Sequence, residues 1–158
     1  MKKKLFFLFL LLFLVACGEE KLVREYKVDG FAYYTKQKEE EPEILYKAIS
    51  PEGVHLRLSK KTNYPENATQ DFWAQAIRRY VPDKGYRLIK EEKTKKGILF
   101  LFLVPGLQYD YFYFMHFFIK EKAFFLTEAG GQYAFFEEYE KRLLEFIDEV
   151  ERKEGQKP

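Results

Sequence analysis

Cysteine is almost absent from this chain. Cys17 is the only cysteine among 158 residues, so no disulfide can form within the molecule. The fold must therefore be stabilised by its core. Residues for such a core are abundant, because aromatic residues make up 19% of the chain and many of them lie in long apolar runs.

Histidine and serine are also scarce, which argues against common metal and catalytic sites. The only histidines, His55 and His116, fall on different expected strands and have neither HxH nor HxxxH spacing. A metal site would require the fold to bring them together with Asp110 or a glutamate, so we expect His116 to be a hydrogen-bonded core residue. The two serines, Ser50 in a turn and Ser59 at a strand end, lack the GxSxG context of a nucleophile.

Glycine-rich phosphate-binding motifs are missing as well. The sequence contains neither GxGxxG nor GKS/T, and Gly130-Gly131 before an expected helix is interpreted as a turn, with an anion site as the alternative. Paired carboxylates for glycoside chemistry stay open, because glutamate is abundant, although abundance alone indicates no site. We therefore expect no enzyme, no cofactor and no metal.

Positive charge is concentrated at the very start of the chain. Lys2, Lys3 and Lys4 stand among residues 1–16, which contain no acid, so losing this segment would change the net charge from +2 to −1. Nucleic-acid binding depends on a basic surface and is not expected here.

The N-terminus itself carries the clearest pattern in the sequence. The three lysines are followed by an unbroken apolar run at 5–15, then by Ala16 and Cys17. This order is typical of a bacterial secretory signal peptide. The run is too short for a membrane-spanning helix, which needs roughly 20 apolar residues.

Leu14-Val15-Ala16-Cys17 resembles the lipobox of bacterial lipoproteins. The resemblance implies cleavage before Cys17, removal of the signal peptide at 1–16, and acylation of the Cys17 thiol and amine, so that two or three chains anchor the protein in a bilayer. Residues 17–25 would be the lipidated N-terminus and a tether. Gly18 after the cysteine implies delivery to the outer membrane, facing the periplasm, if the organism is Gram-negative. An uncleaved anchor is the alternative.

Turn signals and apolar periodicity divide the rest of the chain into strands and helices. Strands are expected at 26–36, 44–49, 54–59, 86–92, 98–104, 109–119 and 123–128. Helices are expected at 72–81 and 132–152. Asn67 or Thr69 would cap the first helix, and Pro82 and Gly85 would end it.

Two of these strands must be buried on both faces. Residues 98–104 read ILFLFLV without a polar break, and 109–119 are almost as apolar, whereas a strand with one wet face alternates. The sequence therefore predicts an α+β fold, an antiparallel sheet of about six to seven strands with helices packed on its faces (an α/β/α sandwich). It forms a single domain at 26–152, followed by a frayed tail at 153–158.

This order of three strands, a helix, four strands and a helix resembles the PsbP/Mog1-like fold, including small bacterial envelope proteins of the DcrB type. The resemblance lies in element order and hydrophobic pattern over roughly residues 26–152, not in a motif. It implies a binding or assembly module without catalysis of its own.

Two groups of residues are candidate binding surfaces. One strand carries a tyrosine stripe, which is interpreted as core under a helix or, alternatively, as a partly exposed slot for a partner or apolar ligand: Tyr109, Tyr111 and Tyr113. The first helix carries the second group, Trp73, Arg78 and Arg79, although Trp73 is expected in the core.

The sequence thus favours a membrane-anchored envelope lipoprotein that acts as a non-catalytic binding or assembly module for an envelope partner protein. The alternative is a carrier or sensor of a small apolar ligand held between sheet and helix. An envelope hydrolase is the third hypothesis.

Overall fold

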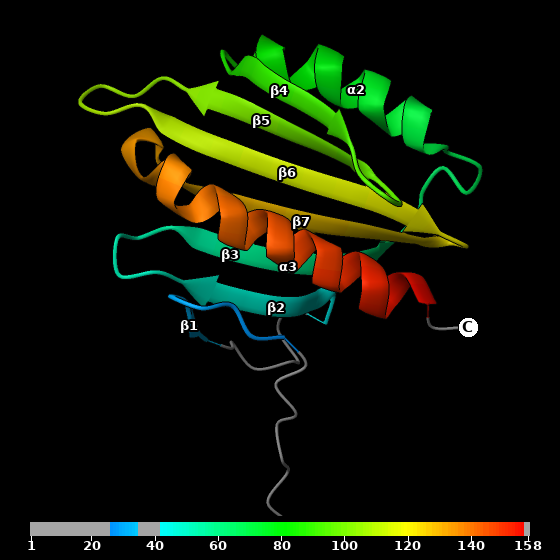
Figure 1. Ribbon diagram of the computed structural model, residues 1–158. Helices are drawn as coiled ribbons and strands as arrows, with labels where there is room; N and C mark the ends of the chain where they lie inside the picture. The colour runs from blue at the N-terminus through cyan, green and yellow to red at the C-terminus, as the bar shows by residue number, and fades with distance from the viewer. Residues whose placement is uncertain (1–25, 35–41, 157–158) are drawn as a thin grey trace, which may run out of the picture.

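The computed structural model describes residues 26–34 and 42–156 (Figure 1). In chain order their elements are β1 (Ala32–Tyr33), β2 (Ile44–Ile49), β3 (His55–Thr62), α2 (Gln70–Asp83), β4 (Arg87–Lys93), β5 (Ile98–Val104), β6 (Tyr111–Lys120), β7 (Ala123–Gln132), the 3-10 turn η1 (Tyr133–Phe135) and α3 (Phe136–Gln156). The expected order of three strands, a helix, four strands and a helix is confirmed.

The expected N-terminal features lie outside the described residues. These are the signal peptide at 1–16, the lipobox at 14–17 with Cys17, and the tether at 17–25, and all of them stay predictions. Among the described helices, none is both long enough and apolar enough to cross a membrane.

All seven described strands form one antiparallel sheet in the order β1-β2-β3-β7-β6-β5-β4. β4 to β7 make a meander in which each strand pairs with the next. β3 pairs with β7 along its whole length, from His55 opposite Gly130 to Thr62 opposite Ala123, and this pairing joins the two parts of the sheet. The predicted α+β fold, an antiparallel sheet with two helices packed against it, is confirmed.

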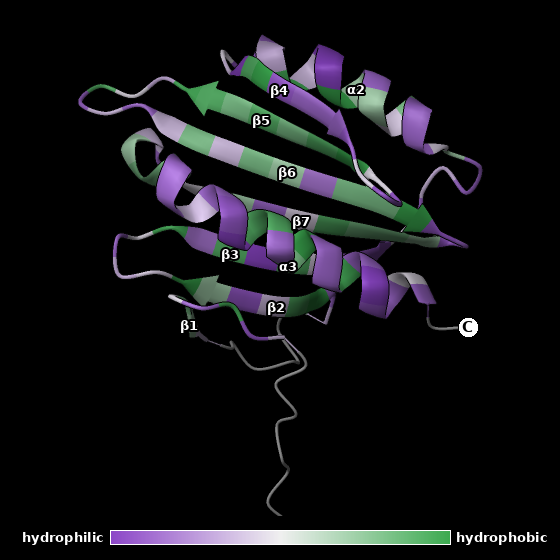
Figure 2. Cartoon of the chain, in the orientation of Figure 1, coloured by the Kyte–Doolittle hydropathy of each residue, from purple (hydrophilic) through white to green (hydrophobic). Residues whose placement is uncertain are grey.

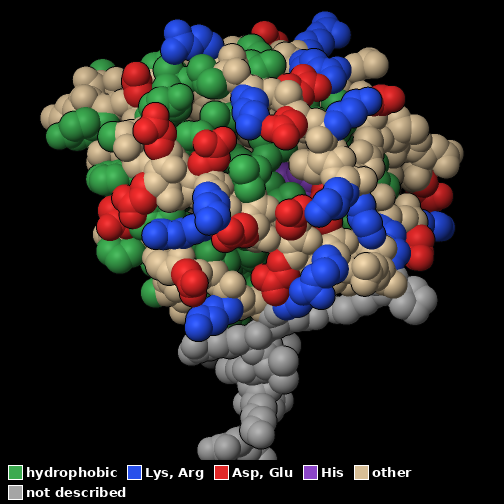
Figure 3. Space-filling view, viewed as in Figure 1, with side chains coloured by type: hydrophobic (Ala, Val, Ile, Leu, Met, Phe, Trp, Pro, Cys, Tyr) green, Lys and Arg blue, Asp and Glu red, His purple; other side chains and the backbone are tan. Residues whose placement is uncertain are grey.

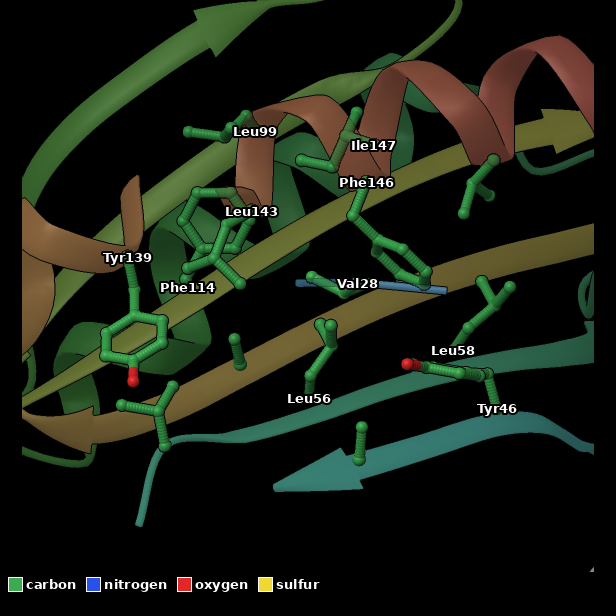
Figure 4. Close-up of a cluster of buried hydrophobic side chains, with 14 of the residues drawn as sticks. Val28, Tyr46, Leu56, Leu58, Leu99, Phe114, Tyr139, Leu143, Phe146 and Ile147 are labelled. Carbon is green, nitrogen blue, oxygen red and sulfur yellow. The ribbon is translucent and has the colours of Figure 1, made fainter. Parts of the chain in front are cut away.

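The two helices lie on opposite faces of the sheet (Figure 1). β5 shows the consequence, because all its residues except Val104 are buried. Leu99 and Leu101 pack in the cluster under α3, shown in part in Figure 4, and Phe100 and Phe102 pack in the cluster under α2. β5 is hydrophobic along its whole length (Figure 2). The unbroken apolar run was therefore a correct indicator of burial on both faces.

The first strand is much shorter than expected. In the described part of 26–36, only Ala32–Tyr33 pairs with β2. The chain turns before it, because Gly30 has a φ of +80° and the Phe31 amide donates to the Val28 carbonyl at 3.2 Å. This left-handed φ favours glycine, and a Cβ at position 30 would also lie 2.8 Å from the Arg142 guanidinium, which would have to move.

The turn expected at Gly130-Gly131 is wrong, because both glycines lie inside β7. Gly130 is paired on both sides, with His55 on β3 and Tyr113 on β6, and Gly131 is paired with Phe112 on β6. A Cβ on Gly131 would lie 2.9 Å from Cγ2 of Val54, so these glycines allow close packing rather than a turn. The anion site considered for this pair is excluded with it, since neither glycine stands at a helix N-terminus.

Other boundaries differ by a few residues. β6 begins at Tyr111, which leaves Tyr109 and Asp110 in the β5–β6 loop. α3 begins at Phe136 after the 3-10 turn and continues to Gln156, so residues 153–156, expected in a frayed tail, are helical. Glu154 in this last turn is buried and accepts a hydrogen bond from the Tyr26 hydroxyl at 2.6 Å, which holds the end of the helix to the N-terminal side of the sheet.

Candidate functional site

α2 forms one wall of the candidate site, and its local sequence fixes both of its ends. The Thr69 hydroxyl accepts the Phe72 amide at 3.1 Å, as an N-cap does, and Asp71 lies in the first turn. Gly85 has a φ of +84° and its amide donates to the Pro82 carbonyl at 2.8 Å, which ends the helix. The position of α2 is thus set by its caps and by the residues it buries, Ala74 and Val81.

A groove of about 540 Å³ lies between α2 and the sheet. Its volume falls within the range of small-molecule sites, roughly 300–1,000 Å³. One face of α2 lines it at positions i, i+3, i+4, i+7, i+8 and i+11: Trp73, Ala76, Ile77, Tyr80, Val81 and Lys84. Three residues close it from the sheet side: Tyr86, Tyr113 and Met115. No acidic residue lines the groove.

The groove lies beside the aromatic layer beneath α2 and not above it. In that layer Phe100 stacks on Phe102 and on Phe117 with interplanar angles of 9° and 6°. These three rings are completely buried and do not line the groove. Ala76 has the shortest side chain among the residues that do line it.

The polar atom of Trp73 points away from the groove. Its indole nitrogen donates to Oδ1 of Asn63 at 2.8 Å, and Asn63 is itself buried and donates to the Ala68 carbonyl at 2.8 Å. The ring packs against Phe124, with centroids 5.2 Å apart. This network fixes the indole orientation and leaves an apolar ring surface at one end of the groove.

The polar atom of Tyr113 is held away in a similar manner. Its hydroxyl donates to Oε1 of Glu128 at 2.7 Å, and Oε2 of Glu128 accepts from Nε of Arg57 at 3.0 Å, so the network crosses β6, β7 and β3. Burial, followed by the neighbouring Glu128 carboxylate, raises the pKa of the Tyr113 hydroxyl far above its ordinary value. Tyr113 therefore stays neutral, with its ring fixed against Tyr86 at a centroid distance of 6.2 Å.

Lys84 is the only charged residue that lines the groove. It follows α2 directly, and its ammonium lies over the Tyr80 ring, 4.7 Å from the centroid. Among the described residues it forms no ion pair. Tyr80 is 62% exposed, so this end of the groove opens to solvent.

The two predicted binding surfaces are rearranged by the fold. Trp73 and Tyr113, assigned to different surfaces, line the same groove. Tyr109 and Tyr111 are not core, because 56% and 42% of their surfaces are exposed. Only Tyr113 of the stripe packs beneath the helix.

The arginines of the first helix do not join Trp73. Nε of Arg78 donates to Oε2 of Glu91 on β4 at 2.8 Å. This hydrogen bond raises the pKa of Arg78 and lowers that of Glu91. Arg79 is exposed and does not line the groove.

Sequence analysis missed several residues of the groove: Ala76, Ile77, Tyr80, Lys84, Tyr86 and Met115. Ala76, Ile77 and Tyr80 recur at helical spacing with other apolar residues of α2, and such spacing predicts contact with a sheet but not a gap. Lys84 stands after the helix and had no pattern to mark it. Its role depends on where the helix lies on the sheet, which sequence periodicity does not give.

A buried polar cluster lies on the other face of the sheet, between α3 and the β4–β5 turn. Nε2 of His116 lies 3.0 Å from Oε1 of Glu151 and 3.1 Å from Oγ1 of Thr94, and the Thr94 hydroxyl donates to the same carboxylate oxygen. The Lys96 amide also donates to it, at 3.2 Å. Burial raises the pKa of Glu151, but the hydrogen bonds from His116, Thr94 and Lys96 outweigh it, so this pKa lies below its ordinary value.

The geometry of this cluster does not fit a nucleophilic triad. A triad places the nucleophile and the carboxylate on opposite ring nitrogens of the histidine. Here Thr94 and Glu151 both meet Nε2 of His116, while Nδ1 has no hydrogen-bond partner in the described part of the chain. His116 is fully buried, and the prediction that it is a hydrogen-bonded core residue is confirmed.

The two histidines do not meet. His55 is exposed and alternates along β3 with Leu56, which packs under α3, so the two side chains lie on opposite faces of the sheet. His116 faces α3, where it contacts Glu151. Within residues 26–34 and 42–156, no three His, Cys, Asp or Glu side chains are grouped as a metal ion would require.

No protein-family model matches the sequence, and no curated protein matches it significantly. The resemblances to bacterial lipoproteins and to the PsbP/Mog1-like fold therefore stay interpretations of pattern.

Proposed function

We propose that this protein is a lipid-anchored envelope protein whose α+β domain binds an apolar ligand in the groove under α2, without catalysis of its own. The groove is the observation that carries the proposal. It is concave, has the volume of a small-molecule site and is lined mainly by aromatic and aliphatic side chains.

The fixed orientation of the lining side chains supports binding rather than catalysis. The hydrogen-bonding groups of Trp73 and Tyr113 are satisfied outside the groove, by Asn63 and Glu128. A ligand between these rings would meet apolar surface that needs little rearrangement, and preorganisation of this kind reduces the cost of binding. No carboxylate, histidine, serine or cysteine lines the groove, so the residues that acyl and glycosyl transfer commonly use are missing from its lining.

Docking of an envelope partner protein is the second candidate. The β5–β6 loop favours it, because Leu107 is fully exposed there and Tyr109 and Tyr111 beside it are half exposed. Exposed aliphatic and aromatic side chains on one loop can serve as anchors for a partner. We prefer ligand binding in the groove as the first candidate function because the groove is concave and largely apolar.

Filling the groove is expected to abolish ligand binding. Trp73 is the only tryptophan, so energy transfer from it to N-phenyl-1-naphthylamine, an uncharged apolar fluorophore, reports binding at this site in the full chain held in amphipol. Ala76→Phe places a ring inside the groove, and we expect the affinity for the fluorophore to fall at least tenfold.

Gln75→Phe is the matched control, because Gln75 neighbours Ala76 on α2 but is exposed and does not line the groove. Its affinity should equal that of the unmodified chain. Equal affinities of the two variants, or no energy transfer in the unmodified chain, would contradict the groove as a ligand site.

The anchor is tested separately. Mass spectrometry of the protein from membranes is expected to find Cys17 as the N-terminal residue, carrying two or three acyl chains. A chain that retains residues 1–16, or an unmodified Cys17 thiol, would remove the basis for placing this protein in the envelope.

A further inference from the structure

We propose that the ligand of the groove is a single-chain amphiphile with an anionic head group, such as a fatty acid, and that Lys84 binds the head. This inference depends on the proposed function and names the chemical class of its ligand. It follows from the distribution of charge and apolar surface along α2.

The charge of the groove is confined to one end. Lys84 is its only charged lining residue, and no carboxylate lines the groove to neutralise it. Several other lysines of the described chain have acidic partners, such as Lys90 with Glu92 at 2.8 Å and Lys95 with Asp148 at 3.1 Å, but Lys84 alone lines this groove. An ammonium without an ion pair at the mouth of an apolar groove attracts an anion and disfavours a cation.

Apolar surface extends from Lys84 toward the other end. Trp73 and Lys84 are eleven residues apart on one helix face, which at the helical rise corresponds to about 16 Å. Between them the groove is bounded by buried Val81 and Met115. An extended alkyl chain of ten to twelve carbons has about this length.

The head group has one place in this groove where it can be neutralised. Toward Trp73, the indole nitrogen is occupied by Asn63, and beside β6 the Tyr113 hydroxyl is occupied by Glu128. A charged head there would be buried without a partner, which is costly. At Lys84 it meets an ammonium and, beside the exposed Tyr80, solvent.

A purely structural role is the alternative explanation for Lys84. A cation after the last turn of a helix interacts favourably with the helix dipole. That interaction requires no groove, and its loss would lower thermal stability without changing ligand preference. Ligand preference is therefore the decisive measurement.

The experiment compares three ligands with the same chain and different heads. Decanoate, decanol and decylammonium are titrated against the full chain in amphipol, and each displaces N-phenyl-1-naphthylamine from the groove. At low ionic strength we expect decanoate to bind about fivefold more tightly than decanol, the size of an exposed ion pair, and decylammonium to bind most weakly. Added salt should reduce the preference for decanoate.

Variants of Lys84 separate the head group from the tail. Lys84→Gln should bring the affinity for decanoate to that for decanol, and Lys84→Glu should make decylammonium the better charged ligand. Arg87→Gln is the matched control, because Arg87 is an exposed cation three residues away that does not line the groove, and it should keep the preference for decanoate.

Two results would overturn the inference while the proposed function stands: equal binding of decanoate and decanol by the unmodified chain, or an unchanged preference in Lys84→Gln, even with a lower melting temperature. Failure of all three ligands and of the fluorophore to bind would instead reject the groove as a ligand site.

Discussion

Replacing Leu143 by alanine is expected to lower the free energy of unfolding by about 3 kcal/mol, the middle of the range for a buried leucine. Leu143 lies on α3, is completely buried and belongs to the cluster that joins this helix to the sheet. Figure 4 shows Leu143 among the side chains between α3 and the sheet, with Phe114, Phe146 and Ile147. The loss combines the burial energy of the three side-chain carbon atoms that are removed with the cost of the cavity that they leave between α3 and the sheet.

Leu144→Ala is the matched control for this change. Leu144 is the next residue of the same helix and is only partly buried at the edge of the same cluster, so we expect a loss of about 1 kcal/mol. Urea unfolding measures both, with the midpoint shifted and the slope unchanged. Equal losses for the two leucines would mean that α3 is not docked through the face described here.

This face of α3 was predictable from sequence alone. Six of its apolar residues recur at helical spacing, which predicts one buried face, and all six are buried: Phe136, Tyr139, Leu143, Phe146, Ile147 and Val150. The opposite face is charged, and Figure 3 shows acidic and basic side chains interspersed over the surface on this side of the molecule. The periodicity of apolar residues was sufficient to predict the buried face because the helix packs against the sheet along one side only.

Strand patterns were equally informative where one physical rule dominated. β3 alternates as its sequence indicated, with His55 and Arg57 exposed and Leu56 and Leu58 buried. β5 has the predicted bounds and is buried on both faces. In each case the pattern of side chains reports directly how many faces of the strand meet a hydrophobic layer.

The sequence-based predictions were wrong where one residue type is compatible with two different structures. Gly130-Gly131 indicated a turn because glycine is common in turns, but here the missing side chains admit Val54 against a central strand. Tyr109, Tyr111 and Tyr113 alternate as if they belonged to one strand, but the strand starts only at Tyr111. Which use applies depends on neighbours from distant parts of the chain.

The candidate groove shows the same limit. Trp73 and Tyr113 were both noted, but forty residues separate them, and no pattern in the sequence indicated that α2 would bring them together. The groove between α2 and the sheet is bounded by Ala76 and other residues of α2 on one side and by Tyr86, Tyr113 and Met115 on the other. Such a gap is a property of two packed surfaces and not of either sequence segment.

Glu151 had no sequence signal at all, yet a substitution there is expected to be among the most damaging in the chain. It stands among exposed acids on α3 but is itself 1% exposed. Its Oε1 accepts hydrogen bonds from the Thr94 hydroxyl and the Lys96 amide and meets Nε2 of His116, so it connects three elements. Glu151→Leu would leave these groups buried without their acceptor.

We expect Glu151→Leu to lower the free energy of unfolding by about 3 kcal/mol or more, as when one partner of a buried pair is removed. Glu145→Leu is the matched control, since Glu145 lies on the same helix in an exposed pair with Lys141, and exposed pairs contribute about 0.5 kcal/mol or less. Similar losses in thermal or urea unfolding for the two variants would show that the buried cluster contributes no more than a surface pair.

Glu151→Gln keeps the shape of the side chain but removes its charge. Comparing this variant with the unmodified chain at acid pH should therefore isolate the contribution of the carboxylate charge to stability. Because the folded-state pKa of Glu151 is lowered, its carboxylate contributes stability that is fully present above the unfolded-state pKa, about 4.3, and is lost as pH falls through the folded-state value. The difference in unfolding free energy between the unmodified chain and Glu151→Gln should thus shrink as the pH falls below about 4.3. Parallel stability profiles of the two proteins down to acid pH would mean that Glu151 carries no charge in the folded state. The connection between α3 and the β4–β5 turn would then depend on hydrogen bonds to a neutral group.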